Sequence, residues 1–205
     1  MKQVLFVHGM GRSPLSAWPM LRRLRKQGIK TSTFSYFVSS QSFDLIQFRL
    51  EKRIREIARQ GEYVLIGHSL GGVLIRAALA NLNNSVSLPE HLFLLGSPVN
   101  ASRLAVFFRQ YWLFRILTKD CGALLASSQR MQQIPASICT TTSIIGVKGI
   151  NGSKSPFKDE LNDGVVSISE VSADWMTEQI QLPVMHSFLP SSRQISDRII
   201  DKLSY

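Results

Sequence analysis

The sequence is poor in cysteine, in acidic residues and in long apolar runs. Two cysteines in 205 residues cannot form the disulfide framework of a small secreted domain. The N-terminus shows no apolar stretch of signal-peptide length with a cleavage pattern, and no run is long enough for a transmembrane helix. No group of Cys and His residues has the spacing of metal ligands. We therefore expect a cytoplasmic protein without a disulfide framework and without a metal site.

The shortage of acidic residues leaves a formal net charge of +10, from 24 Lys and Arg against 14 Asp and Glu. The excess is uneven, because residues 1–60 hold twelve basic residues against three acidic ones, whereas 151–205 is net acidic. Residues 101–130 add five basic residues against one acidic residue. Two interpretations stay open, namely a solvated basic face or attraction to an anionic surface such as phospholipid headgroups. We expect no nucleic-acid partner.

Short apolar segments alternate with amphipathic ones along the whole chain. We expect strands at 4–7, 30–37, 63–66, 91–95, 138–147 and 179–184, and helices at 16–27, 43–59, 70–82 and 193–203. This alternation predicts an α/β fold with a mainly parallel sheet covered by helices on both faces. No repeat, low-complexity tract or linker divides the sequence, so we expect a single domain over 1–205. Cys139 falls in the fifth strand, as a buried small apolar residue.

The most informative motif is Gly-His-Ser-Leu-Gly at 67–71, between the strand at 63–66 and the helix at 70–82. A serine on such a sharp strand-to-helix turn has strained backbone geometry and an outward-pointing hydroxyl. Side chains at 67 and 71 would collide across the turn, which explains the two glycines. The helix N-terminus that follows favours developing negative charge. The motif predicts that Ser69 is a catalytic nucleophile.

A serine nucleophile needs a base and an acid that orients the base. In a strand–turn–helix setting of this kind the chain order is serine, acid, histidine. Of the four histidines, His186 alone follows the later acids, directly after a strand end, and is the expected base. Asp163 is the expected acid, because it ends a turn-rich loop and precedes Gly-Val-Val, which anchors it to the core. Asp159 and Asp174 remain alternatives for the acid.

Two backbone N–H groups are expected to bind the oxyanion of the reaction intermediate. The first belongs to Leu70, the residue after the nucleophile. The second is that of Met10, in a loop where Gly9 and Gly11 let the backbone approach a substrate. A glycine-rich loop after a strand can also bind phosphate, but neither G-x-G-x-x-G nor a P-loop lysine is present.

Taken together, 8–11, 67–72, 163–166 and His186 resemble α/β-hydrolases of the lipase and carboxylesterase kind, above all small bacterial lipases, over nearly the whole chain. The resemblance implies an α/β-hydrolase fold, reduced at the N-terminus, that cleaves carboxylic esters through a Ser-His-Asp triad and an acyl-enzyme. It implies no metal and no organic cofactor. One departure concerns the substrate pocket. Where such lipases often have Gly-Thr-Pro-His-x-Gly, residues 96–101 read Gly-Ser-Pro-Val-Asn-Ala.

Residues 104–117 combine three Phe, one Tyr and one Trp with Arg109 and Arg115. They form either an ordinary core-facing helix or part of a short helical cap, at about 101–130, that lines an acyl pocket and touches a lipid interface. The expected substrate is a small ester or a lipid, with peripheral contact to an anionic membrane. Thioester or amide cleavage, and a non-catalytic binding scaffold, stay open as alternatives. The candidate substrate-binding residues are His8, Gly9, His68, Phe107, Phe108 and Trp112.

Overall fold

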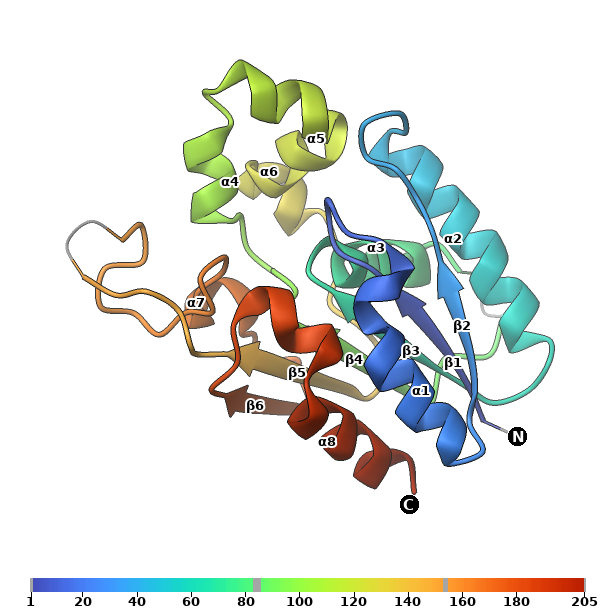
Figure 1. Ribbon diagram of the computed structural model, residues 1–205. Coiled ribbons are helices and arrows are strands. Elements are labelled where there is room, and N and C mark those ends of the chain that lie inside the picture. Colours follow the sequence, from blue (N-terminus) through green and yellow to red (C-terminus); the bar gives the residue numbers. More distant parts are fainter. Residues whose placement is uncertain (1, 83–85, 153–154, 205) are drawn as a thin grey trace.

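A single six-stranded sheet forms the centre of the computed structural model, which describes residues 2–82, 86–152 and 155–204 (Figure 1). The strand order is β2-β1-β3-β4-β5-β6. All neighbouring strands are parallel. The strands are β1 (Gln3–Val7), β2 (Lys30–Phe34), β3 (Tyr63–His68), β4 (His91–Leu95), β5 (Thr141–Gly146) and β6 (Glu178–Leu182). β1, β3 and β5 are buried along their entire length, as expected for parallel strands covered on both faces.

Helices cover both faces of the sheet, as the alternation in the sequence predicted. On one face, α1 (Trp18–Lys26) packs beside α8 (Arg193–Leu203), and their buried residues join those of the strands in one apolar cluster. On the other face lie α2 (Phe43–Ala58) and α3 (Leu70–Ala80). Ten of the eleven α3 residues are buried, because this helix lies between the sheet and α2. The helix and strand predictions for these segments are confirmed to within a few residues at each end.

The segment after β4 leaves the sheet and folds into three helices at the top of Figure 1: α4 (Arg103–Phe108), α5 (Trp112–Leu125) and α6 (Ser128–Gln132). The expectation of one continuous helix over 104–117 is therefore wrong, since residues 109–111 separate α4 from α5. α5 is itself kinked at Lys119, whose backbone has φ 42° and ψ −128°. The part of α5 after the kink enters the core through Cys121, Leu124 and Leu125, whereas the part before it contributes the partly buried Phe114.

Smaller differences from the sequence-based expectations concern segment ends and single turns. β5 begins at Thr141, so Cys139 precedes the strand and is half-buried, with its sulfur in a hydrogen bond to the Ser137 hydroxyl. Three short helices were not expected: η1 (Pro14–Ala17), α7 (Ile168–Val171) and η2 (His186–Ser191). Within the described residues, no helix is both long and apolar enough to cross a membrane.

Candidate active site

The candidate residues lie at one edge of the sheet, where the parallel strands end. The loop at 8–11 follows β1, Ser69 follows β3 and His186 lies beyond β6. Asp163 lies in the long connection between β5 and β6. Because the carboxyl ends of parallel strands meet at the same edge, segments far apart in the sequence converge there.

Ser69 has the strained backbone that its motif predicted, with φ 51° and ψ −123°. A positive φ is costly for any residue with a Cβ atom, so surrounding contacts must hold it in place. The Ser69 N–H donates to the Leu95 carbonyl at 2.9 Å, and the buried Ser97 hydroxyl donates to the Ser69 carbonyl at 2.8 Å. The serine of the Gly-Ser-Pro segment thus fixes the turn from the neighbouring strand.

The glycines on either side of Ser69 are required by two different close approaches. A Cβ atom on Gly67 would lie 2.4 Å from the Cα atom of Gly72, which is a collision across the turn. A Cβ atom on Gly71 would lie 2.2 Å from the Val7 carbonyl oxygen, so here the obstacle is β1 rather than the turn. The expectation of a collision across the turn therefore holds for Gly67, whereas Gly71 lets α3 begin against the first strand.

Asp163 and His186 form a buried pair, with exposed fractions of 1% and 7%. Nδ1–H of His186 donates to Oδ2 of Asp163 at 2.6 Å. The other carboxylate oxygen accepts N–H groups of Val165 and Val166 at 3.0 and 2.9 Å, and the His186 N–H donates to the Asp163 carbonyl at 2.9 Å. These bonds fix the acid and the imidazole tautomer, and they leave Nε2 of His186 as the nitrogen able to accept a proton. Of the three candidate acids, Asp159 and Asp174 are exposed, and Asp163 is the one bonded to His186.

Two glycines make room for this pair. Gly96, at the end of β4, has φ +52°, and a Cβ atom there would lie 3.0 Å from both Oδ2 of Asp163 and Nδ1 of His186. Gly146, at the end of β5, would place a Cβ atom 2.7 Å from that of Asp163. Gly96 was noted in the sequence only as part of a possible pocket wall, and the structure places it against the Asp163–His186 hydrogen bond.

No protein-family model and no curated protein sequence matches the chain. Solved structures, by contrast, do match the chain. The mature lipase BlEst2 of Bacillus licheniformis superposes with a TM-score of 0.77 at 21% identity, over 98% of this chain and 91% of that one. The RedJ thioesterase of the prodiginine pathway in Streptomyces coelicolor gives 0.66 at 16% identity, over 98% and 84%. A methylesterase from Arabidopsis gives 0.64 at 14% identity, over 100% and 99%. The chain has the α/β-hydrolase fold.

Within this α/β-hydrolase fold, His68 has a position that its motif does not reveal. It was expected to bind substrate, but its ring is 1% exposed and packs against that of His186, with centroids 4.8 Å apart. Its Nε2–H donates to the His186 carbonyl at 3.1 Å, while Nδ1 has no hydrogen-bond partner among the described residues. Burial, with the nearby His186 ring, holds the pKa of His68 well below its ordinary value, so the ring is neutral. His68 supports the backbone of His186 and has no surface to offer a substrate.

His8 is likewise built into the loop after β1. Its ring is 2% exposed and stacks on Tyr36 at 4.2 Å; Nδ1–H donates to the Gly9 carbonyl at 2.9 Å. The Tyr36 hydroxyl donates to the His8 carbonyl at 2.7 Å. Burial lowers the pKa of His8 and keeps it neutral. The expected substrate contact by His8 is therefore replaced by a structural contact that shapes the loop carrying Met10.

The loop that His8 shapes lies directly against the nucleophile. A Cβ atom on Gly9 would lie 3.1 Å from that of Ser69. In the described part of the chain, the Met10 and Leu70 N–H groups donate to no other backbone group. Neither amide is therefore committed to a backbone acceptor in this part of the chain. Phe107, Phe108 and Trp112, the aromatic candidates for substrate binding, lie instead on α4 and α5 and are 51%, 41% and 69% exposed.

Proposed function

We propose that this α/β-hydrolase is a serine hydrolase that cleaves carboxylic esters of apolar acyl groups. The observation that carries the proposal is the buried Asp163–His186 hydrogen bond of 2.6 Å, at the same sheet edge as the strained Ser69. A buried carboxylate on Nδ1 makes Nε2 a general base and stabilises the imidazolium that forms when this base takes a proton. A positive φ at the residue before a helix is the geometry of an exposed nucleophile.

The proposed mechanism follows from these positions. Ser69 Oγ attacks the ester carbonyl carbon while Nε2 of His186 takes its proton, and Asp163 stabilises the resulting imidazolium. The Met10 and Leu70 N–H groups bind the oxyanion of the tetrahedral intermediate. Its collapse breaks the bond to the alkoxide, which receives the proton from His186 and leaves as the alcohol. Water then attacks the acyl-enzyme by the same route and releases the carboxylic acid. The proposal calls for no metal and no organic cofactor.

Two further observations support an ester with an apolar acyl group. The names of the similar structures describe a lipase, a thioesterase and a methylesterase, which are enzymes of acyl transfer to water. α4 and α5, which follow β4, carry exposed aromatic side chains, and these two helices lie above the sheet at the top of Figure 1. A triad serves esters, thioesters and amides alike, so the bond that is cleaved must be decided by turnover. The expected cytoplasmic location stays a prediction.

Active-site labelling with a fluorophosphonate tests the enzyme assignment. We expect stoichiometric labelling of the wild-type protein and none of Ser69→Ala. Gly67 and Gly71 remain in this variant, so its fold is retained, which circular dichroism checks. Absence of labelling in the folded wild type would refute the assignment and leave a non-catalytic scaffold. A panel of p-nitrophenyl esters of increasing acyl length, with one thioester and one amide, then decides the bond. We expect the highest kcat/KM for an ester of a medium or long chain.

A further inference from the structure

The outer surface of α4 and of the first half of α5 is rich in apolar side chains that no other described residue covers. Eight large apolar side chains between residues 106 and 117 are 41–69% exposed. They are Val106, Phe107, Phe108, Tyr111, Trp112, Leu113, Ile116 and Leu117. We call these residues, with Arg109, Arg115 and Lys119, the cap surface. Such a density of exposed aromatic and aliphatic side chains marks an interaction site.

The charges of the cap surface have one sign. Residues 101–119 contain no Asp or Glu. Arg109, Arg115 and Lys119 make no ion pair with a carboxylate in the described part of the chain, whereas the flanking Arg103 and Asp120 are paired, with Glu160 and Arg130. An apolar surface carrying three unpaired cations matches a partner that is apolar in its interior and anionic at its boundary.

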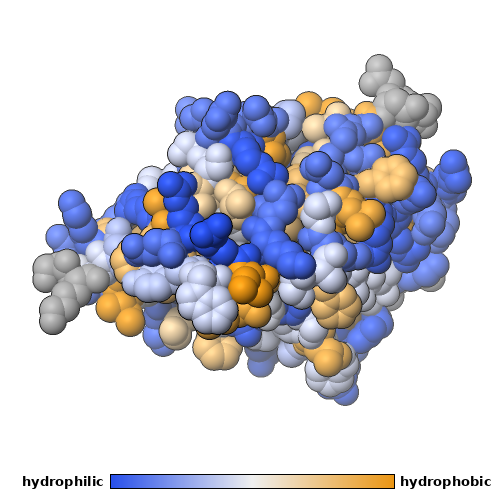
Figure 2. All heavy atoms as spheres, turned by 90° about the horizontal axis from the view of Figure 1, so that it is seen from above, coloured by the Kyte–Doolittle hydropathy of each residue, from blue (hydrophilic) through white to orange (hydrophobic). Residues whose placement is uncertain are grey.

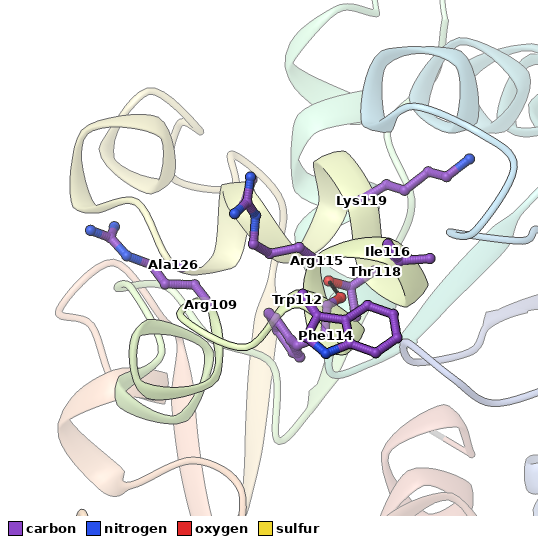
Figure 3. A pocket seen from close by; sticks show the side chains of 9 residues that line it. Arg109, Trp112, Phe114, Arg115, Ile116, Thr118, Lys119 and Ala126 are labelled. Atoms are coloured by element: carbon purple, nitrogen blue, oxygen red, sulfur yellow. Dashed lines mark hydrogen bonds between the residues drawn. The ribbon is translucent and has the colours of Figure 1, made fainter.

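A cavity of about 690 Å³ joins the cations to the apolar side chains. Arg109, Arg115 and Lys119 line it together with Trp112, Phe114 and Ile116. In Figure 3 the charged ends of Arg109, Arg115 and Lys119 point to the left, up and to the upper right, and the aromatic rings of the same cavity lie below them. Seen from above, the face that carries these helices mixes hydrophobic with hydrophilic side chains (Figure 2). Protein surfaces that lie at the headgroup boundary of a bilayer have this composition, because aromatic rings and cations are both favoured there.

We propose that the cap surface docks onto an anionic phospholipid bilayer. The exposed aromatic and aliphatic side chains enter the headgroup boundary, and Arg109, Arg115 and Lys119 contact lipid phosphates. The charge pattern selects this partner over a second copy of the chain, because a two-fold interface would oppose the same cations across it. It selects an anionic over a neutral bilayer because the three cations are attracted to a surface of net negative charge.

Contacts at the start of α4 place this docking surface beside the candidate active site. The Arg103 guanidinium donates to the Glu160 carboxylate at 2.5 Å, and the Arg103 N–H donates to the Glu170 carboxylate at 2.5 Å. Both carboxylates belong to the connection between β5 and β6 that also carries Asp163. A bilayer bound to the cap surface therefore lies on the side of the molecule where the acid segment and α4 meet. Docking itself does not depend on hydrolysis.

The test measures co-sedimentation of the Ser69→Ala variant of residues 1–205 with lipid vesicles, so that no lipid is consumed. We expect binding to phosphatidylcholine vesicles that contain phosphatidylglycerol, weakening with added salt, and at least tenfold weaker binding to phosphatidylcholine alone. Replacing Arg109, Arg115 and Lys119 together by Gln should weaken binding about 100-fold, at roughly fivefold for each cation. Trp112→Ser with Ile116→Ser should weaken it about tenfold or more.

Matched variants keep the test specific to the cap surface. One control variant combines Arg25→Gln, Lys26→Gln and Arg198→Gln and so removes the same charge from α1 and α8, on the opposite face of the sheet. This variant should bind vesicles as the parent does. Ile138→Ser removes an apolar side chain elsewhere that is at least as exposed as Trp112 and Ile116. Equal losses in the cap and control variants would overturn the proposal. So would an absence of binding to anionic vesicles at low salt, or self-association through the same residues in analytical ultracentrifugation. Labelling by fluorophosphonate tests the hydrolase assignment separately.

Discussion

Two replacements of His68 distinguish the effect of its hydrogen bond on activity from the effect of its packing. Phenylalanine keeps an aromatic ring against His186 but has no donor, whereas glutamine can place its Nε2 where the histidine Nε2 now lies. The bond at issue is the 3.1 Å contact from His68 Nε2–H to the His186 carbonyl. We expect His68→Phe to lose activity and His68→Gln to recover most of it.

The size of the effect follows from the burial of both groups. A buried carbonyl that loses its donor costs about 1–3 kcal/mol. If most of this cost appears as displacement of His186 from its working position, kcat falls between about fivefold and about 100-fold, since each ~1.4 kcal/mol is a factor of ten. KM should change little, because the His68 ring is 1% exposed and out of reach of a substrate.

The assay is steady-state hydrolysis of a soluble p-nitrophenyl ester across pH, together with urea unfolding of each variant. Low-field proton NMR of the His186 Nδ1–H provides a readout that needs no turnover, and His68→Phe should shift or broaden this signal. Equal kcat for the Phe and Gln variants at equal stability would refute the argument. If the wild type has no esterase activity, the NMR signal still tests the positioning of His186.

Three further predictions concern the acid Asp163, the turn that carries Ser69 and the Arg103–Glu160 ion pair at the start of α4. Asp163→Asn should lower kcat about 10³- to 10⁴-fold with little change in KM, measured by ester hydrolysis; a loss below tenfold would point to another acid. Gly71→Ala should destabilise the protein by about 1–3 kcal/mol in urea unfolding, because its Cβ atom meets the Val7 carbonyl at 2.2 Å; unchanged stability would contradict the packing. Burial alone would raise the pKa of Glu160, but its hydrogen bonds, including that from Arg103, hold it at about 2. Because the pKa of Glu160 is lowered by folding, its carboxylate stabilises the folded state at pH values above its ordinary pKa, and this contribution is lost as the pH falls toward 2. Glu160→Gln should therefore weaken the pH dependence of the unfolding free energy in acid, by about 1 kcal/mol after solvent screening.

Local chemistry explains why the strained turn at Ser69 could be predicted from the sequence. A serine between two glycines at a strand–helix junction has few other conformations open to it, and the structure has Ser69 at φ 51°. His186 could be anticipated by elimination, because the base must follow the acid in the chain, whereas Asp163 was preferred over Asp159 and Asp174 from the Gly-Val-Val that follows it. Their catalytic roles stay predictions until activity is measured.

The parts that could not be predicted depend on contacts between distant segments. The break at 109–111 has no glycine or proline to announce it, and an apolar pattern that runs through it suggests one helix. The roles of His8 and His68 depend on partners 28 and 118 positions away, Tyr36 and His186. The need for glycine at position 96 is seen only in the structure, where Asp163 and His186 lie beside it. A single sequence carries no signal for any of these.

The strain at Ser69 sets two kinds of selection against each other at one position. A φ of 51° costs a residue with a Cβ atom of order 1–3 kcal/mol, which glycine would avoid. Under the proposed function, a lineage that no longer needed ester hydrolysis would gain stability by drifting to glycine there, while the Ser97 and Leu95 contacts to the backbone persisted. The identity of residue 69 in related chains would then report whether each lineage still uses the site.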